Sequence, residues 1–125
     1  MIASIGGIVR EIEGDTLIIE NQGIGYLVYV PKTLCDHARI GEQIFLFTQL
    51  LVREESLTLV GFETKEARKL FNLLLSVNGV GYKLALSILS TLSGDVLRGA
   101  ILQNQVDVLA RVPGLGRKTA QKIIL

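Results

Sequence analysis

The pattern of apolar and polar residues along this chain changes its period near residue 64. Before that point, short runs of alternating apolar and polar residues are separated by turn-forming residues, which is typical of half-buried strands. The predicted strands are 2–12, 15–20, 25–30, 44–52 and 57–62, with a short helix over 32–38. Five short strands with one helical insert favour a small closed barrel. The OB-fold is the commonest such barrel, and a small sandwich is the alternative.

Beyond residue 64 the apolar residues recur at helical spacing. Thr64 can cap a helix whose apolar face includes Leu70, Phe71 and Leu74. Further helices are predicted over 82–91, 93–103 and 106–112, and from 117 to the end. Strands and helices in separate blocks predict an α+β fold class, all-β and then all-α. We therefore expect two domains, a barrel over 1–63 and a helical domain over 64–125.

The two halves carry opposite charge, although the net charge of the 125 residues is only +1. Residues 1–62 hold four Lys and Arg against eight Asp and Glu, a net charge of −4. Residues 63–125 hold nine against four, a net charge of +5. This distribution predicts polyanion binding by the second half only. No membrane-spanning segment or secretion signal is expected, and the lone Cys35 fits a reducing, cytoplasmic setting.

A short sequence is repeated within the helical half. Asn78-Gly79-Val80-Gly81 and Pro113-Gly114-Leu115-Gly116 lie 35 residues apart, each between two helix-like runs. The residues that follow also match: Lys83 with Lys118, Ala85 with Ala120, and Ile88 with Ile123. A single turn of this kind could simply join two antiparallel helices. Two copies in matching apolar frames, with matching lysines, favour a device that binds a nucleic-acid backbone.

The residue types in these turns suit a phosphate group. Glycine tolerates positive φ, and its missing side chain lets an anion approach the backbone. The helix that follows directs its free N–H groups and the positive end of its dipole at that anion. Lys83 and the Arg117-Lys118 pair add cations, and Thr119 adds a hydroxyl. Such contacts hold the sugar-phosphate backbone without reading sequence, and they weaken as salt rises.

The two turns are helix-hairpin-helix motifs, and the whole chain resembles the RuvA family, the Holliday-junction-binding subunit of the bacterial branch-migration complex. The segments that carry the resemblance are Met1-Ile2, Gly23-Ile24-Gly25-Tyr26, Phe47-Thr48, Val52-Arg53-Glu54-Glu55, Gly61-Phe62, and the two turns with Lys83-Leu84-Ala85-Leu86 and Lys118-Thr119-Ala120. The resemblance implies an N-terminal OB-fold that oligomerises, followed by a tandem helix-hairpin-helix domain. It also implies a homotetramer, or an octamer on DNA, that holds four-way junction DNA for a separate RuvB motor.

The resemblance also implies roles for individual residues. The expected DNA-binding residues are Asn78, Gly79, Val80, Gly81, Tyr82, Lys83, Pro113, Gly114, Leu115, Gly116, Arg117, Lys118, Thr119, Lys122 and Arg53. Glu54 and Glu55 match an acidic pin at the tetramer centre, whose carboxylates repel phosphates at the crossover. Without the resemblance, the same two residues would be interpreted as an ordinary solvated hairpin tip.

Two departures from the family pattern stand out. Tyr82 occupies a position that is commonly proline, a residue suited to the first position of a helix. The chain stops at Leu125, whereas family members continue through a linker to a third domain that contacts RuvB. We therefore expect a fragment of a longer protein, without that C-terminal domain and without direct binding to the motor.

Other chemistry finds little support in the sequence. Gly116-Arg117-Lys118-Thr119 lacks the spacing of an ATP-binding phosphate loop. His37 and Cys35 are the only residues of their types and make a poor zinc site. We expect no catalytic residues, no metal and no cofactor, and hence a non-catalytic subunit. The alternatives are another helix-hairpin-helix DNA-binding module, such as a DNA repair glycosylase or nuclease domain, and a general single-strand binder using the barrel.

Overall fold

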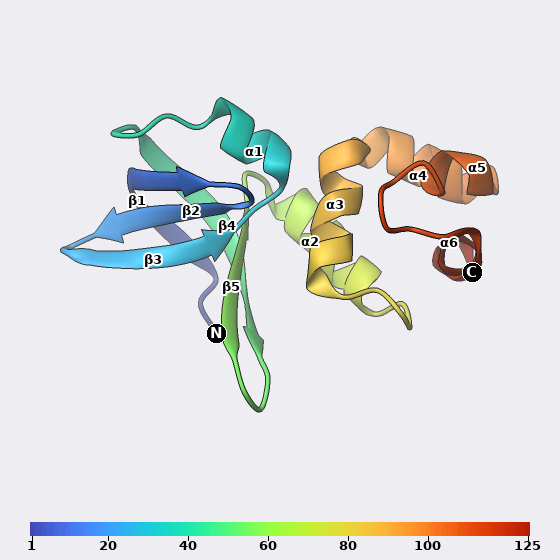
Figure 1. The fold of residues 1–125 in the computed structure, drawn as a ribbon, viewed down its shortest axis with the longest axis horizontal. Coiled ribbons are helices and arrows are strands. Elements are labelled where there is room, and N and C mark those ends of the chain that lie inside the picture. Colours follow the sequence, from blue (N-terminus) through green and yellow to red (C-terminus); the bar gives the residue numbers. More distant parts are fainter. The chain divides into compact units, whose positions relative to one another are not determined.

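The computed structural model describes residues 1–125, and in it five strands precede all but one of the helices (Figure 1). The strands are β1 (Ser4–Glu13), β2 (Thr16–Asn21), β3 (Ile24–Tyr29), β4 (Gln43–Val52) and β5 (Leu57–Phe62). The helices are α1 (Lys32–His37), α2 (Lys65–Leu75), α3 (Tyr82–Thr91), α4 (Gly94–Leu102), α5 (Val106–Leu109) and α6 (Arg117–Ile124). The predicted α+β class, all-β and then all-α, is confirmed.

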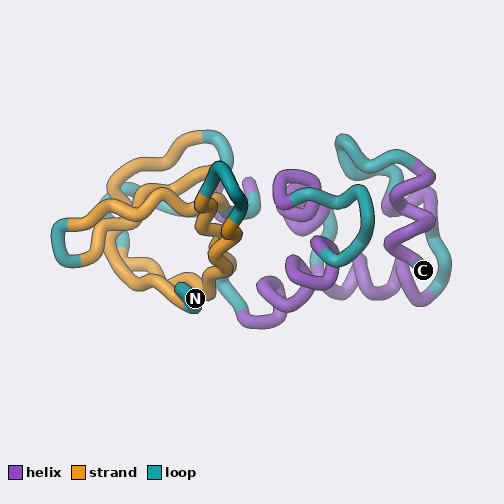
Figure 2. Tube along the Cα trace, turned by 90° about the horizontal axis from the view of Figure 1, so that it is seen from below, coloured by secondary structure: helices purple, strands orange, loops and turns teal.

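The strands form a closed barrel in the order β1-β2-β3-β5-β4. Closure follows because the long β1 pairs with β2 along one part and with β4 along another. The β3–β5 pairing is parallel and the other four are antiparallel. Figure 2 shows the strands, in orange, curving around the interior. The predicted OB-fold barrel, with its helix between β3 and β4, is therefore confirmed, and the sandwich alternative is wrong.

Apolar side chains at alternate positions along the strands fill the interior of the barrel. On β2, Leu17 and Ile19 are fully buried while their neighbours are partly exposed, as the period of two requires. The other core residues of the barrel include Val9, Val28, Val30, Leu46 and Val60. Cys35 of α1 lies against this core, and its thiol donates to the carbonyl oxygen of Thr16 at 3.7 Å. Burial raises the pKa of the Cys35 thiol, so it packs as an apolar residue.

Three side chains fasten the N-terminal segment and the start of α2 to β4. The buried hydroxyl of Thr48 donates to the carbonyl oxygen of Ile2 at 2.6 Å. The Arg68 guanidinium donates to the carbonyl oxygen of Ala3 at 2.8 Å and lies 5.7 Å from the ring centre of Phe47. The barrel and the first turn of α2 accordingly form one compact unit, Met1–Arg68, and Lys69–Leu125 form a second.

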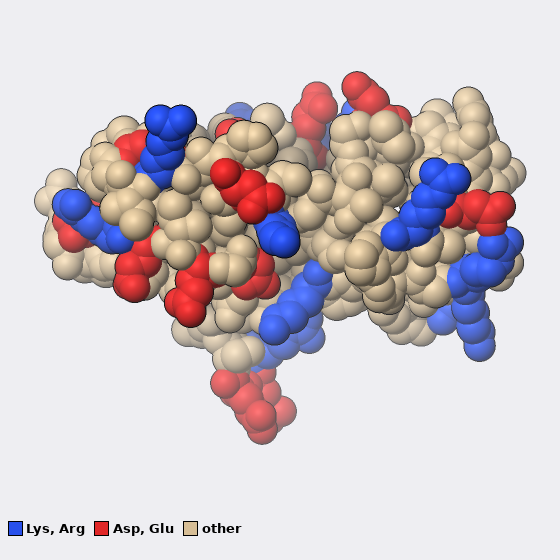
Figure 3. Space-filling view, turned by 45° about the horizontal axis from the view of Figure 1, so that its top comes forward, with Lys and Arg blue, Asp and Glu red and all other residues tan.

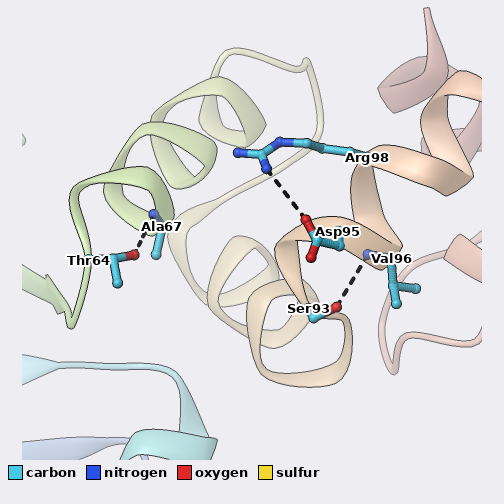
Figure 4. A network of polar contacts seen from close by, with 6 residues as sticks. All are labelled: Thr64, Ala67, Ser93, Asp95, Val96 and Arg98. Carbon is cyan, nitrogen blue, oxygen red and sulfur yellow. Dashed lines mark hydrogen bonds and ion pairs between the residues drawn. The ribbon is translucent and has the colours of Figure 1, made fainter.

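Hydroxyl caps begin two of the helices, and the one at Thr64 is the cap that the sequence predicts. The Thr64 hydroxyl accepts from the backbone N–H of Ala67 at 3.1 Å at the start of α2. The Ser93 hydroxyl accepts from the N–H of Val96 at 3.2 Å at the start of α4 (Figure 4). Such caps satisfy N–H groups that the helix itself leaves unpaired. The core of the second unit is made by Phe71, Leu74, Val80, Ala85, Leu86, Ile88, Leu97, Ala100, Leu109, Val112, Leu115, Ala120 and Ile123.

One predicted helix is shorter than expected. The prediction over 106–112 is wrong at its C-terminal end, because α5 stops at Leu109. The N–H groups of Arg111 and Val112 bond to carbonyl oxygens three residues back, at 3.3 and 3.1 Å, in tighter turns. Pro113 follows, and the residue before a proline is disfavoured in the α-helical conformation.

No single helix has the length and apolarity to cross a membrane. Only α3 and α4 taken together reach both, and they are bent by 100° relative to each other.

Candidate nucleic-acid interface

The first turn (residues 78–81) and the second turn (residues 113–116) have the same backbone conformation. The leading glycines, Gly79 and Gly114, have φ of +94° and +85°. The trailing glycines have φ and ψ of −90° and 178° at Gly81, and of −80° and 167° at Gly116. The repeat in the sequence is therefore a repeat in the structure.

Each turn is closed from within by one apolar residue between its glycines. The N–H of Val80 donates to the carbonyl oxygen of Val77 at 3.1 Å, and the N–H of Leu115 donates to that of Val112 at 3.0 Å. Val80 and Leu115 are buried, with 6% and 4% of their surface exposed. The turns are thus anchored on the core, and the glycines on either side of the anchor are exposed.

The backbone requires glycine at two of these four positions and not at the other two. Gly79 and Gly114 adopt the left-handed region that other residues rarely occupy, so the turn itself needs them. Gly81 and Gly116 have extended backbone that any residue can adopt, and a Cβ added to either would meet no atom within 4 Å. Nothing within the protein requires the trailing glycines. Their backbone faces open space, where a bound group could approach closely.

Both helices that leave the turns begin without a capping side chain and without an acidic residue in the first turn. The first helical bonds run from Ala85 N–H to Gly81 and from Ala120 N–H to Gly116, at 3.0 and 2.9 Å. The N–H groups that come before Ala85 in α3 and before Ala120 in α6 have no acceptor within their helix. The positive end of each helix dipole lies at these groups. Each turn therefore offers backbone donors and a positive potential to an anion.

Most of the predicted cations are exposed beside these donors. Lys83 is the second residue of α3, and Lys118 is the second residue of α6. Arg117 and Lys122 are also exposed on α6, whereas Thr119 is half-buried. Tyr82, at the position corresponding to Arg117, is half-buried as the first residue of α3.

The two turns belong to one unit and are linked by α3. The Ser87 hydroxyl of α3 donates to the carbonyl oxygen of Pro113 at 3.4 Å. The side chain of Leu84, also on α3, lies 3.8 Å from the place where a Cβ on Gly114 would stand. The helix that leaves the first turn thus packs against the second turn.

Arg53, Glu54 and Glu55 lie in the other compact unit, at the tip of the β4–β5 hairpin. The N–H of Arg53 donates to the carbonyl oxygen of Ser56 at 2.9 Å, which leaves the two glutamates in the loop. Both glutamates are exposed, and Figure 3 shows acidic side chains, in red, at the projecting tip of this hairpin. No group of three or more His, Cys, Asp and Glu side chains lies together.

One charged residue at the second turn was missed by the sequence reasoning. Asp107 of α5 accepts from the guanidinium of Arg117 through Oδ1 and Nη1. Ten residues separate the pair, which is not a spacing at which helical neighbours meet. No local pattern could have predicted it, because it depends on how α5 packs against α6.

Comparisons with known proteins match nearly all residues of the chain. Residues 1–61 match the model of the RuvA N terminal domain, and residues 71–125 match that of a SAM-like Helix-hairpin-helix tandem. The chain is 51% identical, over its whole length, to the Holliday junction branch migration complex subunit RuvA of Chloroflexus aggregans. The chain belongs to the RuvA family. The resemblance predicted from the turns and the barrel segments is confirmed.

Other RuvA subunits are similar over the same extent. The identity is 48% with the subunit of Chloroflexus aurantiacus and 39% with that of Yersinia pestis, each over 100% of this chain. The chain spans 65% of the length of the two Chloroflexus relatives and 62% of the Yersinia pestis one.

Proposed function

We propose that this chain supplies the DNA-binding part of a Holliday junction branch migration subunit, acting in DNA recombination and repair. It binds four-way junction DNA by structure and not by base sequence. Its family membership supports this, because the relatives are named as branch migration complex subunits. The observation that carries the proposal is the open backbone at Gly81 and Gly116, duplicated beside exposed cations.

The chemistry of the turns argues for phosphate as the ligand. A side chain at either trailing glycine would fit the protein, so the missing side chain serves something outside it. A phosphate oxygen can accept from the N–H groups at the helix start while a lysine neutralises its charge. The proposed contacts come from Asn78, Gly79, Val80, Gly81, Tyr82, Lys83, Pro113, Gly114, Leu115, Gly116, Arg117, Lys118, Thr119 and Lys122. Because these contacts go to backbone phosphates, they carry no sequence information.

The hairpin tip of the barrel has a different proposed role. Glu54 and Glu55 act as an acidic pin, whose charges disfavour phosphates near the crossover, and Arg53 contacts a phosphate beside it. This role requires several copies of the tip to meet. We therefore include in the proposal a homotetramer, or an octamer on DNA, assembled through the barrel.

The remaining parts of the proposal concern the larger complex. The chain is non-catalytic, uses no cofactor and works in the cytoplasm, and the separate ATP-driven motor, RuvB, is a partner of the full-length protein. Domain boundaries near residues 63 and 64 would separate the oligomerising barrel from the DNA-binding helices.

Gel shifts test the proposed substrate. A four-way junction, a linear duplex and a single strand are compared over a range of salt concentrations. We expect the junction to bind most tightly, with affinity for each DNA falling steeply as salt rises. Equal affinity for all three would exclude a junction-specific protein.

A pair of serine substitutions tests the open glycines. Gly81→Ser with Gly116→Ser places a good N-cap residue at an extended position, so the thermal midpoint should hold or rise. The new hydroxyls would occupy the helix N–H groups that phosphate needs. Hydrogen bonds to charged groups contribute about 1.5–3 kcal/mol, so junction affinity should fall by roughly tenfold or more.

The matched control is Gly99→Ser on α4, which also has open space around an added Cβ. It should bind junction DNA as the unchanged chain does. If the double serine variant folds and binds equally well, the turns do not contact phosphate.

A further inference from the structure

The two turns differ in whether a cation at the turn is paired with a carboxylate. At the second turn, the first residue of α6, Arg117, is paired with the carboxylate of Asp107 on α5. Both side chains remain exposed, at 65% for Arg117 and 77% for Asp107. Lys83 of the first turn has no such carboxylate partner. The second turn therefore carries its own counter-ion, and the first does not.

A carboxylate presents to arginine what a phosphate presents, namely oxygen atoms that accept from the guanidinium N–H groups. Asp107 engages Arg117 through a single nitrogen and a single oxygen, which is short of the two-pronged arrangement that fixes both groups. We propose that Asp107 is an internal competitor of DNA at the second turn. A phosphate and Asp107 compete for the guanidinium N–H groups of Arg117. This inference rests on the proposed function.

Two effects of Asp107 oppose each other. Holding Arg117 in place would favour DNA binding by ordering the side chain beforehand. Competing for the guanidinium, and repelling phosphate by its own charge, would disfavour it. Exposed ion pairs restrict their partners only weakly, and many contribute nothing measurable to stability. Competition and repulsion therefore outweigh ordering, and loss of the carboxylate should tighten binding.

The test is Asp107→Asn, with Asp95→Asn as the matched control. Asp95 lies in the first turn of α4 and pairs with Arg98 at 3.8 Å (Figure 4), so its substitution changes the net charge equally. It releases no cation at either turn. Binding to a linear duplex and to a four-way junction is measured for each variant of the 125-residue chain over a range of salt, with thermal melts to verify folding.

We expect Asp107→Asn to tighten binding to both DNAs by roughly two- to fivefold, the range of exposed ion pairs. The slope of log affinity against log salt should steepen by at most about 0.9, the value for one full phosphate contact, because Arg117 makes part of that contact in the unchanged chain. Asp95→Asn should produce a smaller gain and little change in slope. In an Arg117→Gln background, Asp107→Asn should give no more than Asp95→Asn does.

Several results would overturn the inference. These are weaker binding by Asp107→Asn, equal gains in the two asparagine variants, or a gain that survives the loss of Arg117. Binding by the unchanged chain distinguishes failure of the proposed function from failure of the inference about Asp107. If the unchanged chain binds neither DNA, the proposed function fails and the inference fails with it. If the unchanged chain binds and Asp107→Asn brings no gain, only the inference fails.

Discussion

The first and second turns have nearly the same backbone but different outward-facing side chains. The leading glycines differ by only 9° in φ, at +94° and +85°. The first residue of the following helix is Tyr82 in one case and Arg117 in the other. Lys122 of the second copy corresponds to the uncharged Ser87 of the first. The second turn therefore carries three cations and the first carries only Lys83, so the first depends more on its backbone donors.

The residues that face the core are matched between the two copies of the repeat. Val80 and Leu115 anchor the turns, and Ala85 and Ala120 are fully buried one turn into the helices. A buried alanine lets packed elements approach closely, and a larger residue there would strain the core. Packing thus constrains the inward residues of both copies alike. The outward residues are free to differ, and they decide how strongly each turn attracts a polyanion.

The largest expected effect concerns the leading glycines, where the two turns should behave alike. Gly79→Ala and Gly114→Ala each force a side chain into the left-handed region, at a cost of about 1–2 kcal/mol. An added Cβ at residue 114 would meet only Leu84, at an ordinary 3.8 Å, and at residue 79 nothing. We expect losses equal to within about 0.5 kcal/mol by chemical denaturation.

The control for this pair is Gly99→Ala, inside α4. Glycine is unfavourable in a helix interior, so this variant should gain roughly 0.5–1 kcal/mol. A large difference between Gly79→Ala and Gly114→Ala would mean that the two turns are not equivalent supports of the fold.

The second prediction concerns the lysines, where the two turns should behave differently. Lys83→Ala removes the only cation of the first turn, whereas Lys118→Ala leaves Arg117 and Lys122 in place. We expect Lys83→Ala to weaken junction binding several-fold and Lys118→Ala to weaken it less. Each should make the salt dependence shallower by about 0.9, as expected for one lost phosphate contact.

Salt-titrated gel shifts of both single variants and of the double variant would measure these changes. An unchanged slope in the double variant would remove both lysines from the phosphate contacts. Equal losses in the two single variants would show that neighbouring cations do not compensate for Lys118.

The sequence was sufficient to predict those parts of the molecule that local chemistry decides. The alternation on β2 places Leu17 and Ile19 in the barrel core, as the pattern requires. Thr64 caps a helix because its hydroxyl reaches the N–H group three residues on. The leading glycines, Gly79 and Gly114, could be found because a left-handed backbone position restricts the residue type so strongly.

Other parts depend on contacts between distant segments and could not be predicted in the same way. The anchoring of Ala3 by Arg68 joins residues that are 65 positions apart. The contact of Ser87 with Pro113, and the pair formed by Asp107 and Arg117, follow from how the helices pack. The sequence reasoning therefore counted Asp107 only as a charge, although it lies against a proposed binding residue.

The smallest expected effect lies outside both turns and provides a baseline for comparing them. Glu54→Gln with Glu55→Gln removes two charges from the exposed tip of the β4–β5 hairpin without a change of size. If the turns alone hold the DNA arms, affinity for a linear duplex should change by less than about twofold. Junction affinity should hold or rise, because removing carboxylates removes repulsion of phosphate. Strand exchange, measured as spontaneous branch migration of a mobile junction, should be altered. A large loss of junction affinity would contradict the pin, since repelling groups cannot weaken binding by their removal.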